Sequence, residues 1–239
     1  MIKRFLLTTC SAVIVPFLAF SQTHELRVGI TSGISNFTGS GSVGKSVLNG
    51  SSQQEYYTNN PYGKKYGINL GGAVNYRYVF ATNVILGAEA AFERLQTKVD
   101  LEGNEFANGS RGLTKLNQQF LNFNPFVGYR VFFEPMSMDM QLGVDLAKTL
   151  SMKENGSIED KQGNKTEFDR DRGKIIDLDI RPRLQFNVNY DRYTVFASYS
   201  WGLKDYQSGL IGGDFGPARL NVFRLGLQYQ LLRPVDRAE

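Results

Sequence analysis

The sequence predicts an all-β protein: an eight-stranded antiparallel up-and-down transmembrane β-barrel preceded by a signal peptide. Three observations lead to this prediction. They are a single apolar run at the N-terminus, eight later segments in which apolar and polar residues alternate, and connections that are long and short in turn. Alternation with a period of two is typical of a strand with two different faces. A helical membrane protein is excluded, because it would need several apolar stretches of about 20 residues.

The N-terminal run has the layout of a signal peptide. Lys3 and Arg4 form a positively charged start, and residues 5–20 are mostly apolar. A small residue, Ser21, then precedes Gln22, which is the pattern of a cleavage site. We therefore expect cleavage between Ser21 and Gln22.

The single cysteine, Cys10, lies inside this segment and would be removed with it. The mature chain would then have neither a disulfide nor a cysteine metal site. We therefore expect a signal peptide over 1–21, the predicted β-barrel over 22–232 and a short tail over 233–239.

The first four alternating segments each place large apolar residues on one face. Residues 25–30 alternate Leu, Val and Ile with Glu, Arg and Gly, and residues 68–80 alternate apolar and aromatic residues with Asn, Gly and Arg. Residues 84–93 alternate Val, Leu, Ala and Phe with Gly, Ala and Glu. Residues 121–131 alternate Leu, Phe, Pro, Val and Tyr with Asn, Gly and Arg.

The last four segments follow the same rule. Residues 138–146 alternate Met, Leu and Val with Asp, Gln and Gly, and residues 176–190 alternate apolar residues with Asp, Arg, Gln and Asn. Residues 193–203 alternate Tyr, Val, Ala and Trp with Thr, Ser and Gly, and residues 223–231 alternate Phe, Leu and Tyr with Arg, Gly and Gln. Most are long enough for a tilted transmembrane strand of about 9–11 residues, whereas soluble strands average about 5–6.

The connections between these segments define two different ends. Short turns are expected at 81–83, 134–137 and 191–192, and long loops at 36–66, 99–116, 151–174 and 204–219. Outer-membrane barrels have short periplasmic turns and longer extracellular loops. We therefore expect an outer-membrane location, with extracellular loops and both mature termini in the periplasm.

The polar face of such a barrel lies inside, and here it is strongly charged. An eight-stranded barrel is just wide enough for side chains to fill it, so a plug of mutual ion pairs is expected. A narrow channel is the functional alternative. The expected interior charges are Arg27, Arg77, Glu89, Glu93, Arg130, Asp145, Asp177, Asp179, Arg181, Arg183 and Arg224.

A soluble lipocalin-like barrel or sandwich is the alternative fold, and it would turn the apolar face inward. Strand length and aromatic residues beside the short turns favour the membrane barrel.

Catalytic and cofactor motifs give little support to an enzyme. Residues 39–46 match the P-loop pattern, but the residues after Ser46 are turn-rich rather than helical, so no nucleotide site is expected. His24 is the sole histidine, which leaves only a carboxylate mechanism through Glu89 and Glu93. We expect no enzyme activity, no cofactor and no metal site.

The opening strand around 26–30 and the Gly-aromatic segments 127–129 and 225–229 resemble the outer-membrane β-barrel domain family. This family is abundant in Bacteroidetes and includes PorT-like proteins. The resemblance implies a small barrel similar to OmpA- and OmpX-like barrels, without catalytic residues. PorT-like members are associated with protein secretion and gliding machinery, so an accessory role there is the second hypothesis.

The expected function is therefore that of a non-enzymatic outer-membrane barrel with a plugged interior, whose loops serve surface interaction or envelope integrity. The charged segment 153–174 is expected to be a solvated flexible loop, with binding of a surface ligand as the sharper possibility. The expected partners are outer-membrane lipid and the barrel-insertion machinery, together with a surface ligand or secretion-system proteins. The small net charge of +4 does not suggest a nucleic-acid partner.

Overall fold

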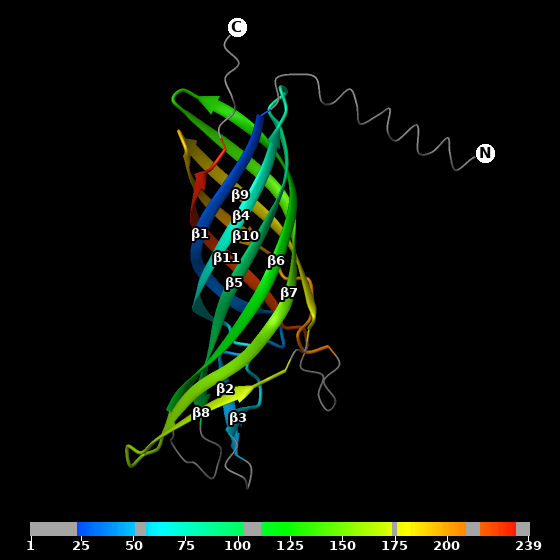
Figure 1. The fold of residues 1–239 in the computed structure, drawn as a ribbon. Helices are drawn as coiled ribbons and strands as arrows, with labels where there is room; N and C mark the ends of the chain where they lie inside the picture. Colours follow the sequence, from blue (N-terminus) through cyan, green and yellow to red (C-terminus); the bar gives the residue numbers. More distant parts are fainter. Residues whose placement is uncertain (1–22, 51–55, 103–110, 174–175, 209–215, 233–239) are drawn as a thin grey trace, which may run out of the picture.

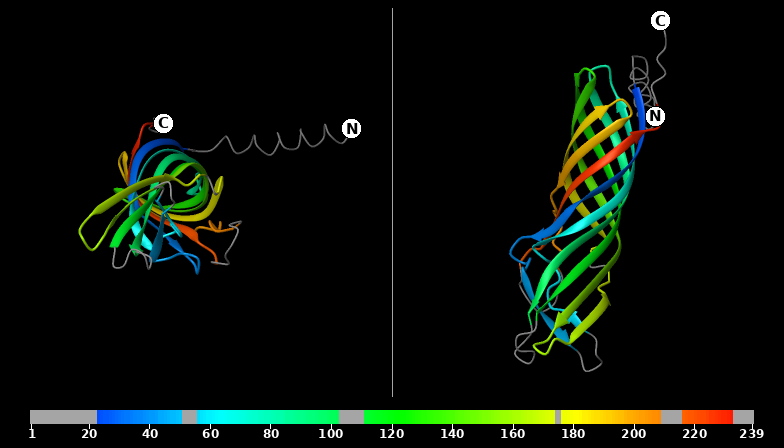
Figure 2. Two further views of the ribbon diagram at one scale, coloured as in Figure 1. Left: turned by 90° about the horizontal axis from the view of Figure 1, so that it is seen from below. Right: turned by 90° about the vertical axis from the view of Figure 1, so that its left-hand side faces the viewer.

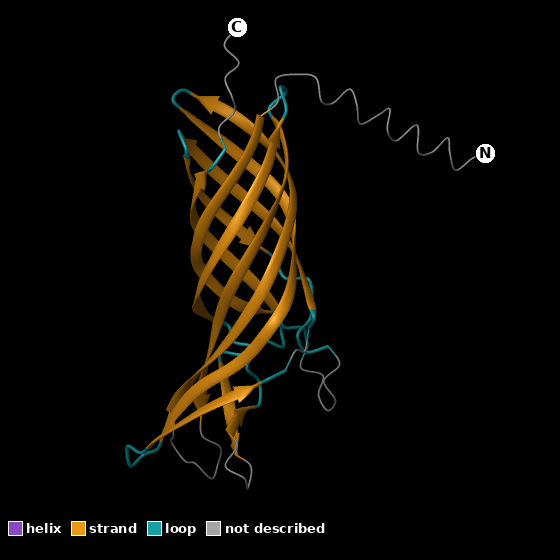
Figure 3. Cartoon of the chain, in the orientation of Figure 1, coloured by secondary structure: helices purple, strands orange, loops and turns teal. Residues whose placement is uncertain are grey.

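A computed structural model describes residues 23–50, 56–102, 111–173, 176–208 and 216–232. The expected signal peptide, its cleavage site and the tail 233–239 lie outside these residues. Within the described part the secondary structure is entirely β (Figure 3). No helix among these residues is long and apolar enough to cross a membrane.

Eight strands form a closed antiparallel ring in the order β1-β4-β5-β6-β7-β9-β10-β11, closed by pairing of β11 with β1 (Figure 2). Sequential ring strands are neighbours throughout, which confirms the up-and-down barrel. β2, β3 and β8 lie outside the ring. The strands are β1 (Thr23–Thr38), β2 (Lys45–Gly50), β3 (Tyr56–Thr58), β4 (Lys65–Val79), β5 (Val84–Glu102), β6 (Arg111–Phe133), β7 (Met136–Glu159), β8 (Lys165–Asp171), β9 (Leu178–Tyr190), β10 (Tyr193–Ser200) and β11 (Arg219–Gln230).

Three tight turns lie at one end of the barrel, as the sequence predicted. They join β4 to β5, β6 to β7 and β9 to β10, and β1 starts and β11 finishes at the same end (Figure 1). Asn83 and Asp191 have positive φ values of 65° and 48° in two of these turns. Asn and Asp tolerate this left-handed conformation better than most residues, so these turns suit their sequence.

The apolar residues of the ring point outward. Among them, Ile30 is 70% exposed, Leu142 is 56% exposed and Val195 is 58% exposed. The outward-facing apolar side chains of the ring strands form a belt around the barrel, which we call the apolar belt. A soluble barrel cannot leave such a belt in water, so the lipocalin-like alternative is wrong. The polar residues of the same strands point inward, as a membrane barrel requires.

β5, β6 and β7 have 19, 23 and 24 residues and are much longer than a membrane crossing needs. Along β5 the polarity of the two faces reverses after Glu93. Phe92 points outward and Glu93 inward, whereas Arg94 points outward and Leu95 is buried inside. This reversal is expected where a strand leaves lipid and enters water, because the outer face must then be polar. The described residues of the expected long connections at 99–116 and 151–174 are therefore mostly strand.

The projecting segments 94–102, 111–119 and 151–159 form a sheet with β2, β3 and β8, and we call this sheet the extension (Figure 1). β2 pairs in parallel with β5, and β8 pairs antiparallel with β7. Segment 153–174 is thus largely a β-hairpin, so the expectation of a flexible loop was wrong. The P-loop-like segment leads into strand β2 at Lys45 rather than into a helix.

Candidate functional site

The barrel interior contains six arginines and six carboxylates that are all nearly inaccessible to solvent. Ten of the eleven expected interior charges belong to this set. Asp177 does not, because β9 starts one residue later and leaves Asp177 exposed before the alternation begins. Glu25 and Asp139 were missed, although they share the inward parity of Arg27 and Asp145 on their own strands. The set is Glu25, Arg27, Arg77, Glu89, Glu93, Arg130, Asp139, Asp145, Asp179, Arg181, Arg183 and Arg224.

The first layer of charges lies toward the tight-turn end. Arg130 donates from Nη1 to Glu25 Oε1 at 2.6 Å and from Nε to Asp139 Oδ1 at 2.7 Å. Arg77 Nη1 reaches Asp139 Oδ2 at 2.9 Å, and Arg27 Nη2 reaches Glu25 Oε2 at 2.7 Å. Glu25 and Arg27 meet because residues two apart on a strand share a face. A vestibule of about 220 Å³ opens over this layer at the tight-turn end.

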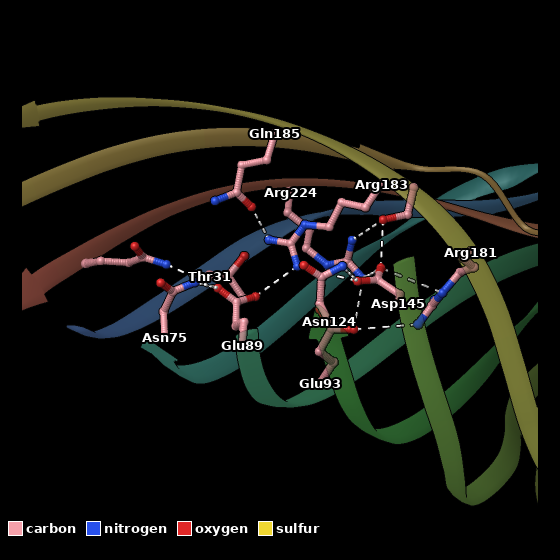
Figure 4. A network of polar contacts seen from close by, with 12 residues as sticks. Thr31, Asn75, Glu89, Glu93, Asn124, Asp145, Arg181, Arg183, Gln185 and Arg224 are labelled. Carbon is pink, nitrogen blue, oxygen red and sulfur yellow. Dashed lines mark hydrogen bonds and ion pairs between the residues drawn. The ribbon is translucent and has the colours of Figure 1, made fainter. Parts of the chain in front are cut away.

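The middle layer joins opposite walls of the barrel (Figure 4). Arg224 of β11 binds Glu93 of β5 through two bonds, Nε to Oε1 at 2.5 Å and Nη2 to Oε2 at 2.9 Å. Arg224 also donates to Asp145 Oδ2 at 3.1 Å, and Arg183 of β9 donates to Glu89 Oε1 at 2.8 Å. Such charge-assisted pairs satisfy ions that would be costly to bury alone.

Amide side chains connect the two layers. Arg77 Nη2 donates to Gln228 Oε1 at 2.9 Å, and Gln228 Nε2 donates to Glu89 Oε2 at 3.2 Å. Between Glu89, Glu93 and the arginines there is a cavity of only about 10 Å³, the size of about one water molecule. The network therefore spans the cross-section of the barrel.

Arg181 lies at the margin of the network that is nearer to the extension. Its nearest carboxylate oxygens belong to Glu93 at 3.7 Å, Asp179 at 3.8 Å and Asp145 at 4.0 Å. The guanidinium carbon lies 5.2 Å from the centre of the Phe120 ring, where a cation–π contact supplements these longer ion pairs.

Between the charges and the extension, an apolar cluster fills the barrel, and we call this cluster the stopper. Phe37, Tyr62 and Tyr206 pack edge to face with ring centroids 5.0, 5.0 and 5.9 Å apart. Burial raises the pKa of both tyrosines, and the Tyr206 hydroxyl donates to Asp179 Oδ2 at 2.9 Å. Sequence analysis missed this cluster, whose members are Phe37, Tyr62, Leu95, Leu116, Phe120, Ala147, Met152, Tyr206, Ala218, Leu220 and Val222.

An ion pair fastens the extension. Glu154 of β7 is fully buried and accepts from Arg172 Nε at 2.6 Å and from Thr114 Oγ1 at 2.8 Å. Thr58 of β3 also donates its hydroxyl to Glu154, and its carbonyl accepts from Arg172. These contacts link β3, β6, β7 and the segment after β8, and so hold the hairpin of β7 and β8 against its neighbours.

The arrangement offers little for catalysis. Glu89 and Glu93, the carboxylates that a barrel enzyme would use, are each held by an arginine. His24 lies at the start of β1, where its Nδ1 is 2.7 Å from the Tyr76 hydroxyl. Among the described residues no group of three or more potential ligands is placed to hold a metal ion.

A closed eight-stranded ring with an apolar outer belt and a polar interior defines an integral outer-membrane β-barrel. Residues 20–208 match the family described as outer membrane protein beta-barrel domain, and the chain belongs to this family. The protein is therefore located in the outer membrane, and the family resemblance is confirmed. Its attribution to Bacteroidetes or to PorT-like proteins stays a prediction.

The solved structures that are similar to this chain include two small barrels, both at low identity. The attachment invasion locus protein Ail of Yersinia pestis, in complex with the heparin analogue sucrose octasulfate, is 15% identical with a TM-score of 0.34, over 87% of this chain and 99% of Ail. Neisserial surface protein A is 11% identical with a TM-score of 0.37, over 86% of this chain and 97% of that protein. No curated protein matches the chain.

Proposed function

We propose that this outer-membrane barrel is a non-enzymatic, non-conducting anchor that presents the extension at the cell surface for interaction or envelope integrity. The observation behind this proposal is the double closure of the interior. A continuous ion-pair network spans the barrel, and the stopper fills the space between this network and the extension. A narrow channel would need a polar path through both levels.

We propose the orientation with tight turns in the periplasm and the extension outside. Longer connections are extracellular in barrels of this kind, and the three tight turns all lie at the other end. The reversal of face polarity after Glu93 supports an extension that lies in water rather than in lipid, because its outer face is polar and its inner face apolar. The choice of the extracellular side rests on the lengths of the connections.

Planar-bilayer recording tests the closed interior. The folded protein, verified by heat-modifiable gel mobility, is expected to give no unitary conductance steps. Reproducible steps from folded protein would overturn the proposal. A variant with the ion pair removed, Glu93→Ala with Arg224→Ala, serves as a comparison, because two long side chains then leave the network while the stopper stays.

The absence of catalysis is tested separately. Glu89→Gln and Glu93→Gln are expected to leave the lipid composition of cells unchanged, because arginine already occupies both carboxylates. A changed lipid profile in either variant at normal protein level would instead support a barrel enzyme.

The second candidate is an accessory component of a secretion or gliding machinery. Among the described strands, β3 pairs only with β2 and β8 only with β7, and the two lie side by side without pairing, with the Arg170 guanidinium carbon 4.8 Å from the centre of the Tyr57 ring. An open groove of about 790 Å³ runs along β8 beside Tyr56. Co-purification of defined partners in detergent would favour this role, and a monomer free of partners would count against it.

A further inference from the structure

Four basic residues lie together on the outer face of the extension, close to where the apolar belt ends. We call them the basic panel: Arg94 and Lys98 on β5, Lys115 on β6 and Lys153 on β7. All four are exposed except Lys98, which is half-buried. β5, β6 and β7 are consecutive neighbours (Figure 1), so the side chains on their outer faces lie next to one another.

The pairing register places like charges opposite each other. Lys98 pairs with Lys65 on one side and with Lys115 on the other, which makes a row of three lysines across β4, β5 and β6. Like charges directly opposite on neighbouring strands destabilise a sheet. Because Lys65 pairs with Asp100, the repulsion that remains is mainly between Lys98 and Lys115, and a bound anion would offset it.

The carboxylates nearby do not neutralise the panel. Asp100 is engaged by Lys65 at 2.5 Å, and Asp171 on β8 lies opposite Lys153 at the margin. Within the described part of the chain, Lys98 and Lys115 form no ion pair. Other exposed lysines of the extension do, such as Lys45 with Glu102 and Lys165 with Glu167, both at 2.5 Å.

The basic panel lies just beyond the end of the apolar belt, on the side of the extension, and this position indicates which kind of anion it could bind. Arg94 is two residues beyond Phe92, which is 48% exposed in the belt, and Lys98 is four residues further. At about 3.3 Å per residue, Arg94 lies about 7 Å and Lys98 about 20 Å beyond Phe92 along the strand, and the strand tilt of about 35–45° makes the distance along the membrane normal shorter. Amide and hydroxyl side chains fill the face between the cations: Gln96, Asn117, Gln119, Ser151 and Asn155.

We propose that the basic panel binds the phosphorylated sugar headgroup of an outer-leaflet glycolipid. Phosphate oxygens would pair with the guanidinium and ammonium groups, and sugar hydroxyls would bond to the amides between them. The acyl chains of the same lipid would lie against the adjoining apolar belt. This inference rests on the proposed function, because it requires the extension to lie on the outer-leaflet side.

Retention of a defined glycolipid by the folded mature protein in detergent tests the proposal. The probe is diphosphorylated lipid A, compared with the same lipid after dephosphorylation and with inorganic phosphate as competitor. The test variant is Lys98→Gln with Lys115→Gln. The matched control is Lys45→Gln with Lys165→Gln, which removes the same charge from ion-paired lysines of the extension.

The wild type is expected to retain the phosphorylated lipid in preference to its dephosphorylated form. A lysine near an anionic lipid surface contributes a factor of about five, so the test variant should retain roughly 25-fold less at low salt. The control should stay close to wild type, Lys98→Arg with Lys115→Arg should restore retention, and added salt should weaken it.

Equal retention of the two lipid forms, or equal loss in test and control variants, would overturn the proposal. Competition by inorganic phosphate at concentrations equal to those of the lipid would also overturn it, because the site would then be one for free phosphate. Every variant is first checked for heat-modifiable mobility and absence of conductance. Those measurements judge the closed interior independently of lipid retention, and labelling of single cysteines in intact cells judges the side on which the extension lies.

Discussion

Removal of one charge from the middle of the barrel tests whether the ion-pair network stabilises the fold. Glu93 is 2% exposed and holds Arg224 at 2.5 and 2.9 Å, with Arg181 at 3.7 Å. Glu93→Gln keeps the shape of the side chain but leaves six interior arginines against five carboxylates. Breaking a buried pair by neutralising one partner costs about 3–5 kcal/mol. Since Arg224 keeps its 3.1 Å contact with Asp145, we expect a loss at the lower end, about 3 kcal/mol.

The assay is equilibrium unfolding by urea in lipid vesicles, followed by fluorescence of the single tryptophan, Trp201. Glu93→Gln with Arg224→Met should lose less stability than the two single variants together, because no unpaired arginine is then left at this position. Glu167→Gln, which breaks an exposed pair, should leave the unfolding midpoint unchanged. A free energy of unfolding for Glu93→Gln within about 0.5 kcal/mol of wild type would refute the reasoning.

Three further predictions concern the packing of the interior. Gly226→Ala should destabilise by about 1–3 kcal/mol in the same assay, because a Cβ there would lie 2.3 Å from the Phe196 ring; an unchanged midpoint would contradict this close approach. Phe120→Ala should cost about 3–5 kcal/mol by opening a cavity in the stopper, and a loss below about 1 kcal/mol would show that the stopper is not tightly packed. Because burial raises the pKa of Tyr62 and Tyr206 above the unfolded value of about 10, their contribution is complete below that pH and is lost as pH rises through the folded pKa values. Alkaline titration of tyrosinate absorbance should show these two ionising after the exposed tyrosines, whereas a single transition near pH 10 would contradict their burial.

Strand alternation predicted the membrane part of the fold well. The ring of eight strands, the three tight turns and the outward apolar face all follow from a period of two. The same parity located ten of the twelve interior charges. Glu25 and Asp139 have the same signal, and Asp177 was wrongly included because the alternation was extended one residue beyond the strand.

The extension was missed for a physical reason. Beyond Glu93 the alternation continues, but the apolar residues change from the outer to the inner face. A search for one constant polarity therefore ends there and reads the rest as loop. The same reversal hid the stopper, since Leu95 lies after the expected end of its strand and Leu116 lies before the expected start of its strand.

Partners from distant positions could not be predicted either. Arg172 and Glu154 looked like balanced charges of one flexible loop, and only the hairpin of β7 and β8 brings them together with Thr58. The row of Lys65, Lys98 and Lys115 likewise depends on the register of three strands, which includes an irregularity between Tyr66 and Leu70. Sequence spacing alone does not determine such a register.

The central claim is a closed outer-membrane barrel that presents the extension outside the cell. Labelling of single cysteines in intact cells with a membrane-impermeant maleimide tests it most directly, in a Cys10→Ser background. Lys161→Cys, between β7 and β8, should react in intact cells. Glu134→Cys, in the turn between β6 and β7, should react only after the outer membrane is permeabilised. Labelling of Glu134→Cys but not Lys161→Cys in intact cells would contradict the account.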